Sequence, residues 1–114
     1  MNNSENGFTD LLRNFVDRHP EGWSHHDWLE LLAELSDRGV DTHEPGRIGS
    51  HLEHQRVLAV LERASVKGLG PKRRAMVADH FGRLWDLRHA SVDDIAALPS
   101  FHRGLAEALH EALH

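Results

Sequence analysis

Cysteine and tyrosine are both absent from this 114-residue sequence. Without cysteine there is no disulfide, no thiolate metal ligand and no cysteine nucleophile. No apolar run approaches the roughly 20 residues that span a bilayer, and the polar amino terminus, Met1 to Asn6, has no hydrophobic signal core. We therefore expect a cytoplasmic protein that does not contact a membrane.

Signatures of catalysis are also missing. No serine stands in a Gly-x-Ser-x-Gly turn, and there is no Walker loop for a nucleotide. The 11 histidines include no His-Glu-x-x-His pattern, so we interpret them as solvated side chains that gain charge between about pH 5 and 7. The sequence predicts no enzyme activity, no cofactor and no metal bound by side chains.

Charge is unevenly distributed over a chain whose net charge is −5. Residues 1–61 carry 5 Lys/Arg and 11 Asp/Glu, whereas residues 62–114 carry 8 Lys/Arg and 7 Asp/Glu. The interval from Arg63 to Arg74 holds five basic residues and no acidic one. Because salt screens charges beyond about 8–10 Å, an anionic partner can bind this interval despite the negative total.

Apolar residues recur at spacings of three and four, and alternating strand patterns are nearly absent. The sequence therefore predicts an all-α fold. We expect a flexible tail at residues 1–8, an acidic region of about three helices at residues 9–61, and a second domain at residues 62–114, with Thr9 and Ser24 as N-caps. Helices are predicted at residues 10–18, 25–38, 47–64, 72–81, 83–89, 92–98 and 102–113.

One short segment, Gly68-Leu69-Gly70-Pro71, has the composition of a tight turn into a helix. The two glycines permit positive φ and have no Cβ to block a close approach. Leu69 can anchor the turn in the core, and Pro71 suits the first helical position. The unpaired amides that open this helix lie at the positive end of its dipole, where a phosphate oxygen binds readily.

Basic side chains surround that turn. Lys67 precedes it, and Lys72, Arg73 and Arg74 follow it. Such cations position a phosphate backbone without reading bases. The alternative is a helix–helix turn in which glycine and proline serve geometry alone.

The longer sequence around this turn resembles the tandem helix-hairpin-helix family, most closely the domain at the carboxyl end of the bacterial ABC excinuclease C protein. The resemblance covers residues 64–113. It implies that residues 62–114 form a tandem helix-hairpin-helix domain after a small helical amino-terminal region. The matching segments are Val66–Arg74, His80–Leu84, Ala90–Pro99 and Leu105–Leu109.

The resemblance implies sequence-independent binding of a nucleic-acid backbone, with double-stranded or structured DNA as the expected partner, in a repair or processing context. Gly68 and Gly70 would approach a phosphate, with Lys72 and Arg73 beside it. In several members of the family, backbone carbonyls of the first hairpin hold a monovalent cation. Val66 and Leu69 stand at the matching positions.

The second hairpin departs from the family pattern, because Ser100 and His102 replace its two glycines. Only Arg103 remains there as a strong cation, so we expect this hairpin to complete the fold and to contact phosphate weakly. The nucleic-acid-binding residues predicted for the whole module are Lys67, Gly68, Leu69, Gly70, Lys72, Arg73, Arg74 and Arg103.

The three tryptophans are predicted to lie in the core. Trp23 and Trp28 flank a helix start, with base stacking by an exposed pair as the alternative. Trp85 stands among leucines and is assigned to the core of the tandem module.

A second function class remains open, namely a protein-interaction or adaptor module. Helix-hairpin-helix folds also serve as such surfaces, and the acidic residues 9–61 suit a protein partner. The two hypotheses differ in where the acidic helices lie. Covering of the basic segment by Glu30, Glu34 or Asp37 would favour the adaptor and predict autoinhibition.

Overall fold

The computed structural model describes residues 3–114, and these residues form helices without any strand. The predicted all-α fold is confirmed. Six of the seven predicted helices agree with the structure to within two residues at each end. Along the described chain, no helix combines the length and the apolar character needed to cross a membrane. The helices are α1 (Asn3–Arg18), α2 (His25–Asp37), α3 (Pro45–Ala64), α4 (Pro71–Phe81), α5 (Leu84–Arg88), α6 (Val92–Ala96) and α7 (Arg103–Ala112).

The first helix begins earlier than the sequence suggests. It starts at Asn3, so residues 3–8 are helical and the predicted tail is wrong there, while residues 1 and 2 lie outside the described part. Thr9 consequently lies inside the helix and does not cap it. The cause is Phe8, which packs on the neighbouring core and meets His51 edge-to-face, with 5.7 Å between ring centroids.

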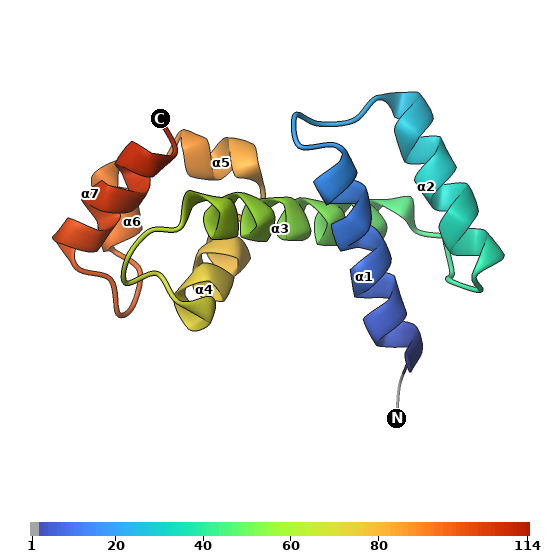
Figure 1. Ribbon diagram of the computed structural model, residues 1–114, viewed down its shortest axis with the longest axis horizontal. Coiled ribbons are helices and arrows are strands. Elements are labelled where there is room, and N and C mark those ends of the chain that lie inside the picture. Colours follow the sequence, from blue (N-terminus) through green and yellow to red (C-terminus); the bar gives the residue numbers. More distant parts are fainter. Residues whose placement is uncertain (1–2) are drawn as a thin grey trace.

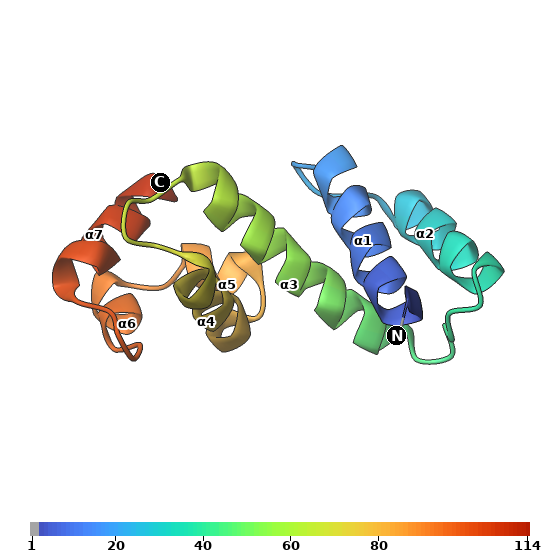
Figure 2. The ribbon, with the colours of Figure 1, turned by 60° about the horizontal axis from the view of Figure 1, so that its bottom comes forward.

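Helix α3 is the axis of the molecule (Figures 1 and 2). Helices α1 and α2 lie at its amino-terminal end, and α4 to α7 gather around its carboxyl-terminal end. The molecule measures 46 × 34 × 22 Å. We call the two ends the amino-terminal lobe (α1, α2 and the beginning of α3) and the hairpin lobe (α4 to α7 and the end of α3). The part of α3 between these ends packs in both lobes.

Each lobe has its own hydrophobic core, and α3 contributes to both. Val57 and Ala59 illustrate this. Side chains two positions apart on a helix are rotated by roughly 200° about its axis, so they point in nearly opposite directions. Val57 is buried in the core of the hairpin lobe and Ala59 in the core of the amino-terminal lobe. The domain boundary predicted between residues 61 and 62 therefore falls inside a continuous helix. The buried residues that α3 supplies are Ile48, Leu52, Val57, Ala59 and Leu61.

Two helices begin with the same reciprocal cap. The Ser24 hydroxyl accepts a hydrogen bond from the Asp27 amide at 3.1 Å, and the Asp27 carboxylate accepts one from the Ser24 amide at 3.0 Å. Ser91 and Asp94 repeat this capping box with the same distances. These bonds lower the pKa of Asp27 and of Asp94. The N-cap predicted at Ser24 is confirmed.

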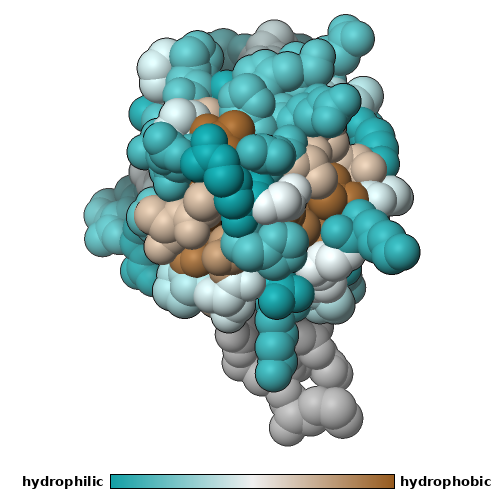
Figure 3. Space-filling model, turned by 90° about the vertical axis from the view of Figure 1, so that its left-hand side faces the viewer, coloured by the Kyte–Doolittle hydropathy of each residue, from teal (hydrophilic) through white to brown (hydrophobic). Residues whose placement is uncertain are grey.

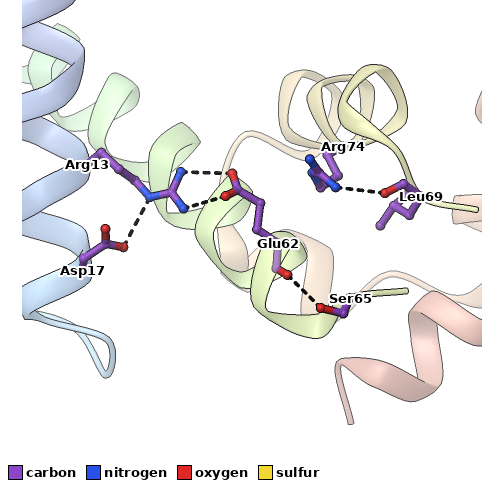
Figure 4. A network of polar contacts seen from close by, with 6 residues as sticks. All are labelled: Arg13, Asp17, Glu62, Ser65, Leu69 and Arg74. Carbon is purple, nitrogen blue, oxygen red and sulfur yellow. Dashed lines mark hydrogen bonds and ion pairs between the residues drawn. The ribbon is translucent and has the colours of Figure 1, made fainter. Parts of the chain in front are cut away.

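An ion pair joins the lobes across the surface of α3 (Figure 4). The Arg13 guanidinium of α1 donates two hydrogen bonds of 3.0 Å to the Glu62 carboxylate of α3. It also donates to Asp17 at 3.3 Å. The bonds from Arg13, and then its charge and that of Arg74, lower the pKa of Glu62.

The shared helix predicts cooperative unfolding. Truncating Leu12→Ala in the amino-terminal core, where Leu12 is 1% exposed, should lower the free energy of unfolding by about 2–5 kcal/mol. Because α3 belongs to both cores, the amide signals of Leu35 and Leu109 should disappear at one common urea concentration in an NMR titration. Leu29→Ala, at a 49% exposed site, is the control and should change stability by less than about 0.5 kcal/mol. Separate midpoints for the two lobes would contradict this prediction.

The Glu62 ion pair predicts a pH dependence of stability. Because folding lowers the pKa of Glu62, its contribution is present above the unfolded-state pKa and is lost as the pH falls below about 4.3. The melting temperature of the native protein should therefore fall more between pH 7 and pH 3 than that of Glu62→Gln. Asp27 and Asp94 titrate in both proteins, so the difference isolates Glu62. Parallel pH profiles would rule out this role.

Candidate nucleic-acid interface

The first hairpin connects α3 to α4 through residues 65–70. Gly68 has a φ of +89°, the left-handed region that favours glycine. Leu69 is 4% exposed and packs in the core of the hairpin lobe, and its amide donates to the Val66 carbonyl at 3.1 Å. Gly70 is the N-cap of α4, and Pro71 follows at the first helical position. Leu69 therefore anchors the turn in the core, while Gly68 and Gly70 leave its backbone uncovered by side chains of their own.

The amino-terminal end of α4 has no side-chain cap. The Arg74 amide donates to the Gly70 carbonyl at 2.9 Å and begins the helical hydrogen bonds. The amides of Lys72 and Arg73 precede this bond and have no backbone partner among residues 3–114. Two donors thus lie at the positive end of the α4 dipole.

The basic residues of this hairpin divide into two kinds. Lys67 and Lys72 are exposed and form no ion pair within the described chain. Arg73 and Arg74 are partly buried and turn toward the hairpin backbone. Arg73 donates to the Gly68 carbonyl at 3.0 Å and to the Ser100 carbonyl at 3.2 Å. The sequence predicts the cluster but does not distinguish the exposed lysines from the bonded arginines.

The second hairpin, between α6 and α7, repeats the backbone path of the first. Ser100 has a φ of +68° and stands where Gly68 stands in the first hairpin. The Phe101 amide donates to the Leu98 carbonyl at 3.1 Å, as Leu69 donates to Val66. The N-cap is extended in both hairpins. The replacement of the glycines has therefore not altered the turn.

The exposed chemistry of the second hairpin differs from that of the first. His102 caps α7 with its own side chain, because its Nδ1 accepts from the Leu105 amide at 3.1 Å. Arg103 donates to the Asp93 carboxylate at 2.8 Å and to Glu107 at 3.2 Å. The bond to Asp93 raises the pKa of Arg103. Of the two amides that correspond to those of Lys72 and Arg73, that of Leu105 is engaged within the protein, and so is the Arg103 guanidinium.

The two hairpins lie side by side at one end of the molecule. Gly70, Lys72 and Arg73 share a hollow of about 450 Å³ with Ser100 of the second hairpin. Figure 3 looks at this end and shows mainly hydrophilic side chains with smaller hydrophobic patches between them. A ligand at the end of α4 would therefore lie next to the second hairpin.

The acidic helices do not cover the basic segment. Helix α2, which carries Glu30, Glu34 and Asp37, packs beside α1 at the opposite end of α3 (Figure 1). Glu30 pairs with His26 at 2.7 Å and Glu34 with Arg38 at 3.7 Å, both within α2 and its cap. This arrangement lacks the covering contact that would predict autoinhibition.

The core assignment of Trp85 is wrong. This side chain is 63% exposed, whereas Leu84 and Leu87 on the same short helix are buried. Five residues of helix can direct only one face inward, and Trp85 lies on the other, stacked on His89 with 3.9 Å between ring centroids. The sequence alone does not show whether an apolar residue beside two leucines points into the core or toward solvent.

Trp23 and Trp28 are half-buried and pack on the amino-terminal core. Trp23 meets Phe15 edge-to-face at 5.3 Å, and the Arg56 guanidinium lies over its ring at 5.3 Å. Both tryptophans also line a cleft of about 560 Å³ between the lobes. Their packing favours the core interpretation over an exposed stacking pair.

The left-handed conformation of Ser100 predicts a stabilising substitution. A side chain with positive φ costs about 1–2 kcal/mol, so Ser100→Gly should raise the free energy of unfolding by about 0.5–1 kcal/mol after the larger unfolded-state entropy of glycine. The matched control is Ser50→Gly inside α3, which should lower it by about 0.5 kcal/mol. Urea denaturation measures both, and a lower midpoint for Ser100→Gly would exclude strain at this turn.

Comparison with known proteins finds relatives that share one name, UvrABC system protein C. UvrABC system protein C of Pseudomonas putida is 34% identical over 86 residues, which are 75% of this chain and 14% of that protein. The protein of the same name from Corynebacterium glutamicum is 42% identical over 86 residues, 75% of this chain and 12% of that protein. The Corynebacterium jeikeium protein is 49% identical over 49 residues, 43% of this chain and 7% of that protein.

No family model matches the chain, and no solved structure matches it. The chain spans only 7–14% of the length of these three relatives. The similarity nevertheless extends over 75% of the chain in two of them. The chain is therefore a homologue of a segment of UvrABC system protein C, which confirms the resemblance to the excinuclease that its hairpin motif predicts.

Proposed function

We propose that the chain binds the phosphate backbone of DNA through its first hairpin, without reading sequence and without catalysis. The observation that carries this proposal is the uncapped amino-terminal end of α4 between two exposed lysines. Homology to a segment of UvrABC system protein C supports a role related to DNA repair.

A phosphate oxygen suits this end of α4 for three physical reasons. The amides of Lys72 and Arg73 are available as donors, and the helix dipole favours a negative charge beside them. Gly70 has no Cβ, so a phosphate can approach its backbone closely. Lys67 and Lys72 add two full charges, and neither forms an ion pair with another of the described residues. Contacts of this kind position a backbone and carry no sequence information.

The second hairpin should add little affinity. Its helix is capped by His102, and Arg103 is paired with Asp93 and Glu107. With one competent hairpin, binding should lie near the weak end of the non-specific range, about 10⁻⁴ M at physiological salt. The second hairpin would contribute mainly by bordering the hollow next to Ser100.

Charge reversal at the lysines tests this proposal. Lys67→Glu/Lys72→Glu should abolish measurable binding to a fluorescent duplex in an anisotropy titration at low salt. Lys67→Met/Lys72→Met should weaken binding and reduce the slope of log K against log salt by about 1.8, or 0.9 for each lost contact. A branched DNA run in parallel reveals any preference for structure.

The control must separate a local contact from net charge. Arg38→Glu/Arg47→Glu makes the same change in total charge on the amino-terminal lobe, where both arginines are exposed. This variant should retain binding. If both charge-reversal variants lose the same amount of DNA affinity, the loss is caused by net charge, and a binding site at the hairpin is refuted.

Gly70→Ala offers a second test that leaves the fold in place. A Cβ at Gly70 meets no atom within 4 Å, and the φ of −80° suits any residue. A loss of binding in this variant would thus report on the approach of the phosphate. Unchanged affinity would mean that the phosphate does not contact the Gly70 backbone.

The alternative function, a protein-interaction module, is favoured by one observation. Trp85 exposes 63% of its surface on α5, on a helix that takes no part in either hairpin turn. An aromatic residue in that position suits a protein partner. If the folded protein does not bind DNA at low salt, the adaptor function becomes the better explanation, and Trp85→Ala should then reduce binding of the partner.

A further inference from the structure

Two arginine guanidinium groups donate hydrogen bonds to carbonyl oxygens of the first hairpin. The Arg74 guanidinium donates to the Leu69 carbonyl at 3.1 Å, a bond that is partly buried (Figure 4). The Arg73 guanidinium donates to the Gly68 carbonyl at 3.0 Å. Two consecutive carbonyls of the turn thus each meet a permanent positive charge.

These bonds bear on the monovalent cation that the family resemblance implies at the carbonyls of Val66 and Leu69. The Val66 carbonyl already accepts from the Leu69 amide at 3.1 Å, and the Leu69 carbonyl accepts from Arg74. A metal ion on the Leu69 oxygen would lie within a few ångströms of a guanidinium, and like charges at such distances repel strongly. The carbonyl oxygens of this hairpin therefore do not form a suitable set of ligands for a metal ion.

We propose that Arg73 and Arg74 take the place of a bound cation in the first hairpin, so that the turn is preorganised for phosphate without a metal ion. Arginine suits this role because its charge is permanent and its planar group carries five donors. Both residues are then positioning residues. The direct phosphate contacts are left to Lys67, Lys72 and the amides of α4.

The environment of each guanidinium supports this role. Arg73 also donates to the Ser100 carbonyl at 3.2 Å and so ties the two hairpins together. Arg74 lies close enough to Glu62 for its charge to lower the pKa of that carboxyl. Glu62 is itself held by two hydrogen bonds from Arg13 of α1. The Glu62 carboxylate therefore lies near Arg13 of α1 and Arg74 of the first hairpin.

The first test does not depend on DNA. Potassium chloride is exchanged for tetramethylammonium chloride at constant ionic strength, and the amide signals of Gly68, Leu69 and Gly70 are followed by NMR. Tetramethylammonium is too bulky to bind among carbonyls. The proposal expects no saturable shift of these three signals, and a saturable shift with potassium would overturn it.

The second test uses a variant and rests on the proposed DNA binding. Arg74→Met removes the guanidinium, and folding is checked through the amide signals of the hairpin lobe. A positioning role predicts affinity for the duplex about tenfold weaker with an unchanged slope of log K against log salt, since no phosphate contact is lost. A slope reduced by about 0.9 would make Arg74 a phosphate ligand and overturn the proposal.

Arg88→Met is the matched control, because Arg88 is an exposed arginine in the last turn of α5 with no side-chain bond among the described residues. Its affinity should change less than twofold. If the wild-type protein does not bind DNA at all, the proposed function fails, and the potassium titration still decides whether the arginines replace a cation.

Discussion

The packing of α3 into two cores is the constraint on which the rest of the molecule depends. A helix that buries one face leaves the other to solvent, whereas α3 buries Ala59 against α1 and α2 and Val57 against the hairpin lobe. It is also the first helix of the first hairpin. The position of the turn at Gly68 is therefore set by packing that includes the amino-terminal lobe, and the ion pair between Arg13 and Glu62 adds a polar contact to the same arrangement.

The two hairpins show how one backbone can carry two chemistries. Gly68 and Ser100 both adopt positive φ, and the residues after them both anchor the turn by bonding back three residues. The difference lies in the N-caps. Glycine leaves the α4 amides open, whereas the ring of His102 satisfies the Leu105 amide and packs so closely that a Cβ on Gly104 would lie 3.2 Å from it. Loss of the glycines therefore changes what the hairpin can bind and preserves how it folds.

Much of the fold follows from the sequence, because helical periodicity and caps are local signals. Ser24, Ser91 and Pro71 lie within one or two residues of the elements that they mark. The errors arise where distant residues decide. Phe8 extends α1 because a core lies beside it, and Trp85 points outward because its leucine neighbours fill the core. The same limit applies to the site, since adjacency in sequence identifies Lys72 and Arg73 as a cluster but cannot say that one is exposed while the other bonds to Ser100.

Net charge is a poor guide to the partner of this chain because charge acts locally. The total is −5, yet the acidic helix α2 and the basic hairpin lie at opposite ends of a molecule 46 Å long. Salt screens such a separation almost completely, since the Debye length is about 8 Å at physiological ionic strength. An anion near α4 meets Lys67 and Lys72 before any carboxylate of α2. The length of α3 thus has an electrostatic consequence, because it holds α2 beyond the range at which its carboxylates would repel a phosphate backbone.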